Sequence, residues 1–176
     1  MTEKLTRFAL ICLCVLPVWM IIRKPWKRRT RYEIALGLFV MYIVALLVMA
    51  LEGNWTSPAA MLQSARERLA TGHGIRVTPF ATICQQLGSI STDESRTQLL
   101  GNTLLFMPWG FFLPYLWRKF RGPLRMALMC LGLTCFIEFT QLFIGRTVDV
   151  DDLLLNFLGS MTGAGLWWIV HRLRKE

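Results

Sequence analysis

The stretch that decides the fold is Thr134-Cys-Phe-Ile-Glu138-Phe-Thr-Gln141-Leu-Phe-Ile-Gly145-Arg146-Thr-Val-Asp149-Val-Asp151-Asp152-Leu-Leu-Leu-Asn156-Phe-Leu-Gly159-Ser-Met-Thr-Gly163. It joins two apolar segments through a short polar connection. Helical spacing places two sets of residues on one face each: Thr134, Glu138, Gln141 and Gly145, then Asp152, Asn156, Gly159 and Gly163. A carboxylate that faces lipid near the middle of a bilayer costs about 2.5–3.5 kcal/mol. We therefore expect Glu138 to point inward, toward polar partners.

The composition indicates a membrane protein. The 176 residues are 54% hydrophobic, with a mean hydropathy of +0.44, which is too apolar for an ordinary soluble domain. We expect an all-α fold, a polytopic membrane helix bundle with about five transmembrane helices, because five segments approach the ~20 residues that cross a bilayer. These segments are residues 5–22, 34–51, 99–117, 124–144 and 153–170.

The expected spans form a single membrane domain, residues 1–176. Residues 1–51 are interpreted as a two-helix scaffold that faces lipid, because they contain few polar side chains. Residues 52–98 form an extracytoplasmic loop, and residues 99–170 form a three-helix core that contains the polar motifs. Within the third span, Pro108 cannot donate to the carbonyl of Leu104, which predicts a kink.

The positive charge gives the orientation. A net charge of +9 would suggest nucleic acid in a soluble protein, but here the basic residues follow the loops at 23–31, 118–125 and 172–175. These loops share one side if the amino terminus is outside and the carboxyl terminus is cytoplasmic, as the positive-inside rule requires. Lys4 and Arg7 are the exceptions. We predict a multi-pass membrane protein, with membrane lipids and no nucleic acid as partners.

Two short amphipathic helices are predicted in the loop. The first begins at Ser57 and Pro58 and ends before Gly72, with an apolar stripe formed by Met61, Leu62, Ala65 and Leu69. The second begins at Thr78 and Pro79 and ends at Gly88. Both helices could lie on the outer leaflet, or they could pack over the bundle.

The polar residues of the last three spans predict one pocket. In the predicted orientation Asn102, Glu138, Gln141 and Asn156 all fall in the outer half of the membrane, below the loop 145–152. Arg146 suits a phosphate or carboxylate, whereas Asp149 and Asp152 accept from hydroxyl, amide or ammonium groups. Glu138 is a candidate general acid or base. No metal and no cofactor are expected, although Glu138, Asp149 and Asp152 could together hold a hard cation.

A structural interpretation of the same residues is also open. Polar side chains hydrogen-bond membrane helices together, and Gly159-x-x-x-Gly163 lets two backbones approach closely. These glycines pack helices within the chain, or they form the seam of a homodimer.

Four ordered motifs resemble the VanZ-like family of bacterial membrane proteins over most of residues 75–170. They are Thr78-Pro79-Phe80, Asn102-Thr-Leu-Leu-Phe106-Met-Pro108-Trp-Gly110, Glu138-x-x-Gln141, and Arg146-x-x-Asp149-x-x-Asp152-x-x-x-Asn156-x-x-Gly159-x-x-x-Gly163. The first two spans contain no family motif, and Trp109 stands where the family commonly has another apolar residue. The resemblance assigns motif membership to a candidate ligand-binding set: Asn102, Glu138, Gln141, Arg146, Asp149, Asp152 and Asn156.

The resemblance also implies a role. The family's name-giving member lowers susceptibility to glycopeptide antibiotics, teicoplanin more than vancomycin, and these drugs act outside the membrane on lipid-linked peptidoglycan precursors. Our first hypothesis is a binding protein for an envelope lipid, a lipid-linked cell-wall precursor or a lipoglycopeptide antibiotic. The second is an intramembrane enzyme that modifies or hydrolyses a lipid headgroup through Glu138, for which the family supplies no established catalytic residue. A lipid or ion transporter is the third.

Overall fold

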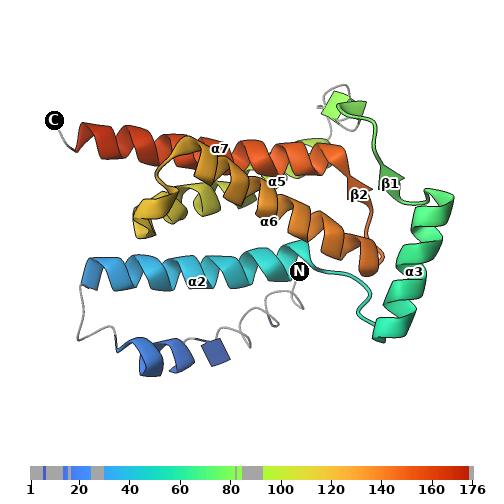
Figure 1. Ribbon diagram of the computed structural model, residues 1–176, viewed down its shortest axis with the longest axis horizontal. Helices are drawn as coiled ribbons and strands as arrows, with labels where there is room; N and C mark the ends of the chain where they lie inside the picture. The colour runs from blue at the N-terminus through green and yellow to red at the C-terminus, as the bar shows by residue number, and fades with distance from the viewer. Residues whose placement is uncertain are drawn as a thin grey trace.

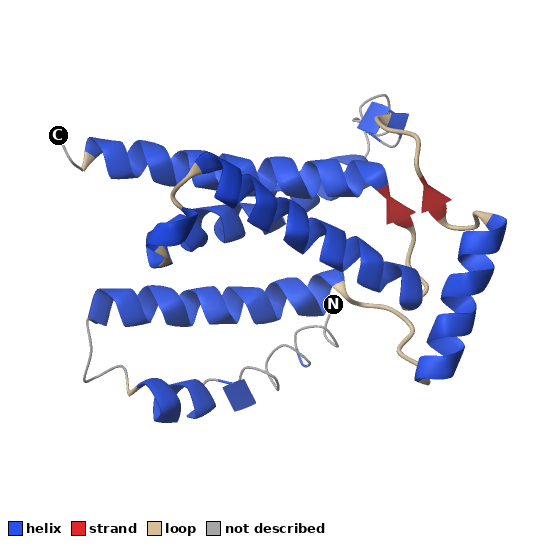
Figure 2. Cartoon of the chain, viewed as in Figure 1, coloured by secondary structure: helices blue, strands red, loops and turns tan. Residues whose placement is uncertain are grey.

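The chain is an all-α protein in the part that the structure, a computed structural model, describes: residues 6, 14–15, 17–24, 30–81, 83–84 and 93–174. Figures 1 and 2 show the arrangement of its elements. They are α2 (Thr30–Ala50), α3 (Pro58–Thr71), β1 (Ile75–Arg76), α5 (Asp93–Leu116), the 3-10 turn η2 (Arg118–Phe120), α6 (Pro123–Phe143), β2 (Val148–Asp149) and α7 (Val150–Leu173). The predicted fold class is confirmed.

In the described part of the chain, three helices are long and apolar enough to cross a membrane, by length and composition. They are α2 from Arg31 to Ala50, α6 and α7. The fourth long helix, α5, covers the predicted third span and continues through Pro108 and Pro114. Half of the predicted span 5–22 lies outside the described residues, and its described residues, 6, 14–15 and 17–22, are helical. The count of five spans therefore stays a prediction.

The helices alternate in direction, so the bundle has two chemically different ends. At one end, which we call the pocket end, α2 and α6 finish, α5 and α7 begin, and α3 runs across them (Figure 1). The opposite or basic end holds the loop between α5 and α6 and the last turn of α7. Its cations include Arg118, Lys119, Arg121, Arg125, Arg172 and Arg174.

The tightest packing joins α5 to α7. A Cβ atom added at Gly159 would collide with the carbonyl oxygen of Thr103, and one added at Gly163 would collide with that of Met107. Gly110 of α5 meets the carbonyl oxygen of Ser160 in the same way. Gly159 and Gly163 are therefore occupied within the chain and do not form a free surface for a homodimer.

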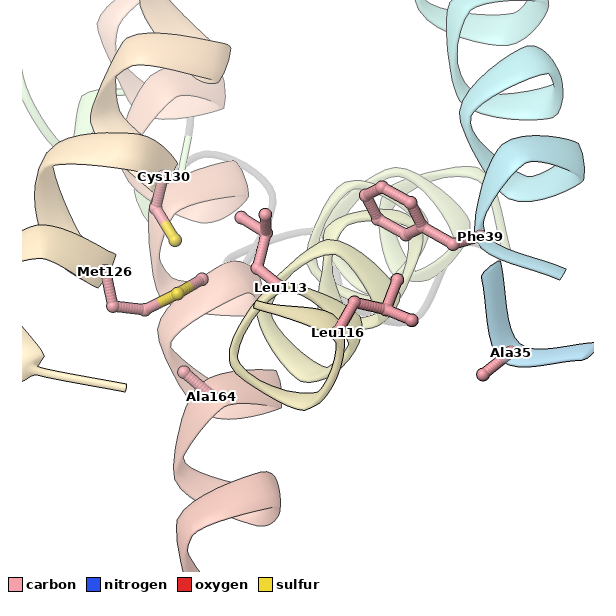
Figure 3. Close-up of a cluster of buried hydrophobic side chains, with 7 residues drawn as sticks. All are labelled: Ala35, Phe39, Leu113, Leu116, Met126, Cys130 and Ala164. Atoms are coloured by element: carbon pink, nitrogen blue, oxygen red, sulfur yellow. The ribbon is translucent and has the colours of Figure 1, made fainter. Parts of the chain in front are cut away.

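The apolar core includes α2. Towards the basic end, Figure 3 shows side chains of α2, α5, α6 and α7 in one cluster: Ala35, Phe39, Leu113, Leu116, Met126, Cys130 and Ala164. A second cluster, Leu46, Ala50, Phe106 and Ile137, lies nearer the pocket end. The carboxylate of Glu33 is also buried and pairs with Arg23 at 2.9 Å. Contrary to the expectation of a lipid-facing scaffold, one face of α2 packs inside the bundle.

The first loop helix has the predicted caps. Ser57 Oγ accepts from Ala60 N at 3.3 Å, Pro58 opens α3, and Gly72 ends it with a φ of +70°. Of the predicted apolar stripe, Ala65 is buried together with Arg68, whereas Leu62 and Leu69 are exposed, which the predicted position on the outer leaflet allows. The helix therefore packs on the bundle through Ala65 and Arg68.

The second loop helix begins later than predicted. Phe80 is exposed and has a φ of +64°, so it lies in a turn, and residues 81, 83 and 84 are helical. Its predicted remainder, as far as Gly88, lies outside the described residues.

Candidate functional site

A cavity of about 270 Å³ opens at the pocket end, between the ends of the four long helices. Its wall is formed by Met49, Ala50, Gly101, Asn102, Leu105, Phe106, Ile137, Glu138, Gln141, Arg146, Asp152 and Asn156. Every residue of the predicted ligand-binding set except Asp149 lines it. Side chains from three helices and one loop, separated by up to 54 positions in sequence, thus meet around one space.

One hydrogen bond joins α5 to α7 at this wall. Asn102 Nδ2 donates to Asp152 Oδ1 at 2.6 Å. Asp152 lies in the first turn of α7, where a negative charge also interacts favourably with the helix dipole. A hydrogen bond to a carboxylate is shorter and stronger than one between neutral groups.

The end of α2 forms a further part of the wall. Gln141 Nε2 donates to the carbonyl oxygen of Ala50 at 3.0 Å, and Arg146 Nη1 donates to the same oxygen at 3.3 Å and to that of Met49 at 3.4 Å. The last carbonyl groups of a helix lack donors from their own backbone, so these side chains satisfy them. Sequence reasoning missed this role of α2, because backbone acceptors leave no motif.

Glu138 and Asn156 are the most buried polar side chains of the wall, at 5% and 4% exposed. Glu138 Oε2 accepts from Asp149 N at 3.3 Å. Among the described residues, neither Glu138 Oε1 nor Asn156 Oδ1 has a hydrogen-bond partner. Unpaired buried oxygens of this kind are rare, because each leaves a desolvation penalty of about 1–3 kcal/mol without compensation.

Asp149 has a structural position instead. Its carboxylate caps the N-terminus of α7 by accepting from Asp151 N at 2.9 Å, and it lies 3.8 Å from Arg76 Nη1. Strand β1 pairs with β2 in parallel, with Arg76 opposite Asp149. Asp149 therefore orients the start of α7, which presents Asp152 to the pocket.

Two residues that the sequence analysis did not select hold the loop in place. Arg68, on α3, donates to the carbonyl oxygens of Leu142 at 3.1 Å, Gly74 at 3.1 Å and Arg146. Asp151 accepts from Phe80 N at 2.6 Å and Ile83 N at 3.0 Å.

A signal for Arg68 was present in the sequence. It follows Met61 and Ala65 at i+7 and i+3, on the face of α3 that packs against the bundle. A charged residue on a packed face indicates a fixed partner. Asp151 had no comparable signal, since its partners are backbone groups that lie far away in sequence.

Apolar residues form the rest of the cavity wall. Leu105, Phe106 and Ile137 line it beside Ala50, and Phe106 and Ile137 belong to the second core cluster. Sequence reasoning assigned no site role to these residues, because apolar residues at helical spacing occur throughout membrane helices.

The carboxylates do not converge as metal ligands. No group of three His, Cys, Asp or Glu residues in the described part of the chain could hold a metal ion. Two carboxylates, Glu138 and Asp152, share the cavity with three amide side chains and one guanidinium group. Such a wall can hydrogen-bond a polar group, and its apolar residues can pack against an apolar one.

One comparison with known proteins gives a match, to a family model. Residues 36–171 match the family model described as VanZ/LLP1, which covers α2 through α7 and every residue of the cavity. No curated protein and no solved structure matches the chain. With more than half of its length matched and its helices apolar enough to span a bilayer, the chain is a membrane protein that belongs to the VanZ-like family.

Proposed function

We propose that the protein binds the polar head of a membrane-anchored envelope ligand in this cavity, and that binding lowers susceptibility to glycopeptide antibiotics. The observation that supports the proposal best is the two-part wall, with polar side chains around Glu138 and Asp152 and apolar ones around Phe106. A lipid or a lipid-linked precursor has the same two parts.

The volume of the cavity limits which part of each candidate ligand can enter. At about 270 Å³ it lies just below the range of about 300–1,000 Å³ that is usual for drug-sized ligands. A whole glycopeptide is far larger, so only its acyl chain or one sugar would enter. A lipid headgroup or a single sugar of a precursor fits without this restriction.

The charge distribution supports an outward-facing pocket. The basic end belongs on the cytoplasmic side by the positive-inside rule, which puts the pocket end outside, with the carboxyl terminus cytoplasmic. Lipid-linked precursors and glycopeptides meet on that side. Arg146, the one guanidinium that lines the cavity in the described part of the chain, would bind the phosphate of such a ligand.

The test is saturable binding to the protein in nanodiscs. Labelled lipid-linked precursor and a lipoglycopeptide are titrated separately against the wild-type protein and Asn102→Ala, which removes the contact to Asp152. The control is Gln63→Ala on α3, which is exposed and outside the cavity. We expect binding that Asn102→Ala weakens at least fivefold and Gln63→Ala leaves unchanged. Absence of saturable binding to both ligands and to phospholipid headgroups would refute the proposal.

The buried position of Glu138 favours one alternative, an enzyme that acts on a lipid headgroup. A carboxylate with one unpaired oxygen beside a ligand cavity has the position of a general acid or base. Mass spectrometry of lipids incubated with wild type and Glu138→Gln separates the two functions. Catalysis requires a product that the variant does not form, and binding alone gives identical lipid profiles.

A further inference from the structure

One nitrogen of each of three cavity side chains donates to an oxygen of the protein itself. Asn102 Nδ2 is bonded to Asp152, Gln141 Nε2 to Ala50 O, and Arg146 Nη1 to Ala50 O and Met49 O. These bonds hold the helices together and direct the donors toward oxygens of the protein itself.

The unpaired atoms of the wall are acceptors. Glu138 Oε1 and Asn156 Oδ1 have no donor among the residues that the structure describes, and both side chains are more than nine-tenths buried. Turning the amide of Asn156 would exchange one acceptor for a donor, but an ionised Glu138 carboxylate only accepts. A ligand that satisfies this wall must bring N–H or O–H groups.

The charges of the cavity wall determine whether a cationic or a neutral donor binds more strongly. Glu138 is buried and Asp152 is half-buried, whereas Arg146 is exposed to solvent. Opposite charges attract more strongly where solvent is excluded, so the two carboxylates outweigh the guanidinium for a group that enters the cavity. A cationic donor is favoured over a neutral hydroxyl.

We propose that the ligand group held between Glu138 and Asn156 is a protonated primary amine. An ammonium group has three donors and no acceptor, which matches two orphan oxygens beside a second carboxylate. Two kinds of ligand contain such an amine, a phosphoethanolamine headgroup and an amino sugar. If the ligand is the phosphoethanolamine headgroup, Arg146 binds its phosphate. This inference rests on the proposed binding function and specifies its ligand.

The test compares ligands that differ only in the lipid headgroup or in the substituent on the sugar nitrogen. Dioctanoyl phosphatidylethanolamine, phosphatidylcholine and phosphatidylglycerol share acyl chains and phosphate, and they present an ammonium, a quaternary amine without N–H, and hydroxyls. Octyl glucosaminide and its N-acetyl derivative form the sugar pair. Binding is measured by titration calorimetry on the purified full-length chain in maltoside micelles.

We expect the ethanolamine lipid or the free glucosaminide to bind at least tenfold more tightly than its matched partners, and the tighter of the two identifies the source. Glu138→Gln should reduce this preference below threefold. The exposed carboxylate of Glu67, on α3, provides the control Glu67→Gln, which should keep the preference. Asp152→Asn is a second cavity variant, expected to reduce the preference if Glu138→Gln does not fold.

The outcomes separate the two proposals. The amine assignment is overturned, and the binding function left standing, if phosphatidylglycerol binds at least as tightly as the ethanolamine lipid and the N-acetyl sugar binds at least as tightly as the free glucosaminide. An amine preference that survives both Glu138→Gln and Asp152→Asn would also overturn it. If none of the lipids or sugars binds, and the precursor and lipoglycopeptide do not bind either, both proposals fail.

Discussion

Replacement of Gly163 by alanine tests the packing on which the pocket depends. The added Cβ would lie well within 3.0 Å of the Met107 carbonyl oxygen, a backbone atom that cannot rotate away, so α5 and α7 must separate. Overpacking typically destabilises a protein by about 1–3 kcal/mol, and we expect about 2 kcal/mol or more here because backbone has to move. Separation of the helices would also lengthen the contact between Asn102 and Asp152.

The matched control is Gly165→Ala, two residues further along α7. A Cβ atom there meets nothing within 4 Å, so the substitution should stabilise the protein by about 0.5–1 kcal/mol through helix propensity alone. Both variants add one methyl group to the same helix, so hydrophobicity and propensity change equally. Their difference therefore reports the contact with α5.

The assay is equilibrium unfolding in mixed micelles, in which a denaturing detergent is titrated into the purified protein and helix content is followed by circular dichroism. The unfolding midpoint should fall for Gly163→Ala and rise or stay constant for Gly165→Ala. Equal midpoints for the two variants would show that α5 and α7 do not pack as described, and the derivation of the pocket would lose its basis.

Three further substitutions test the contacts that surround the pocket. Arg68→Gln removes charged hydrogen bonds to several backbone carbonyl groups, so it should destabilise the protein by about 2–3 kcal/mol and speed proteolysis of residues 52–76. The control Arg66→Gln, at an exposed position, should change neither the stability nor the proteolysis rate. Glu33→Gln leaves Arg23 without its charged partner and should lower the free energy of unfolding by about 1–3 kcal/mol in the same assay; no change would mean that the pair contributes nothing. Asp151→Ala removes the acceptor for Phe80 N and Ile83 N, so hydrogen exchange at these two amides should accelerate at least tenfold, and unchanged exchange would contradict the contact.

The roles of residues that depend on spacing within one helix could be predicted from the sequence. The cap of α3 at Ser57 and Gly72 follows from side-chain and glycine chemistry within a few positions, and it was predicted correctly. The prediction that the polar groups share one level of the bundle followed from alternating helix direction, and the cavity brings Asn102, Glu138 and Asn156 together.

Residues whose partners are distant in sequence were not predictable. Asp149 was expected in the pocket, but its carboxylate bonds to the backbone of α7 and lies beside Arg76, which only the pairing of β1 with β2 brings near. Arg68 was overlooked because its side chain donates to backbone carbonyl groups. Ala50 was overlooked because its backbone carbonyl accepts from a side chain. Periodicity does not identify backbone partners.

The sequence by itself determined that the chain is helical, that it belongs in a membrane, and that its polar and basic groups lie at opposite ends, because hydropathy and charge act on each segment separately. Only the tertiary structure decided which segments touch. Close approach at Gly110, Gly159 and Gly163 joins α5 to α7, and the carbonyl groups at the end of α2 complete the wall. The physical reason is that a cavity is defined by the relative positions of several helices, and those positions depend on steric fit between residues far apart in the chain.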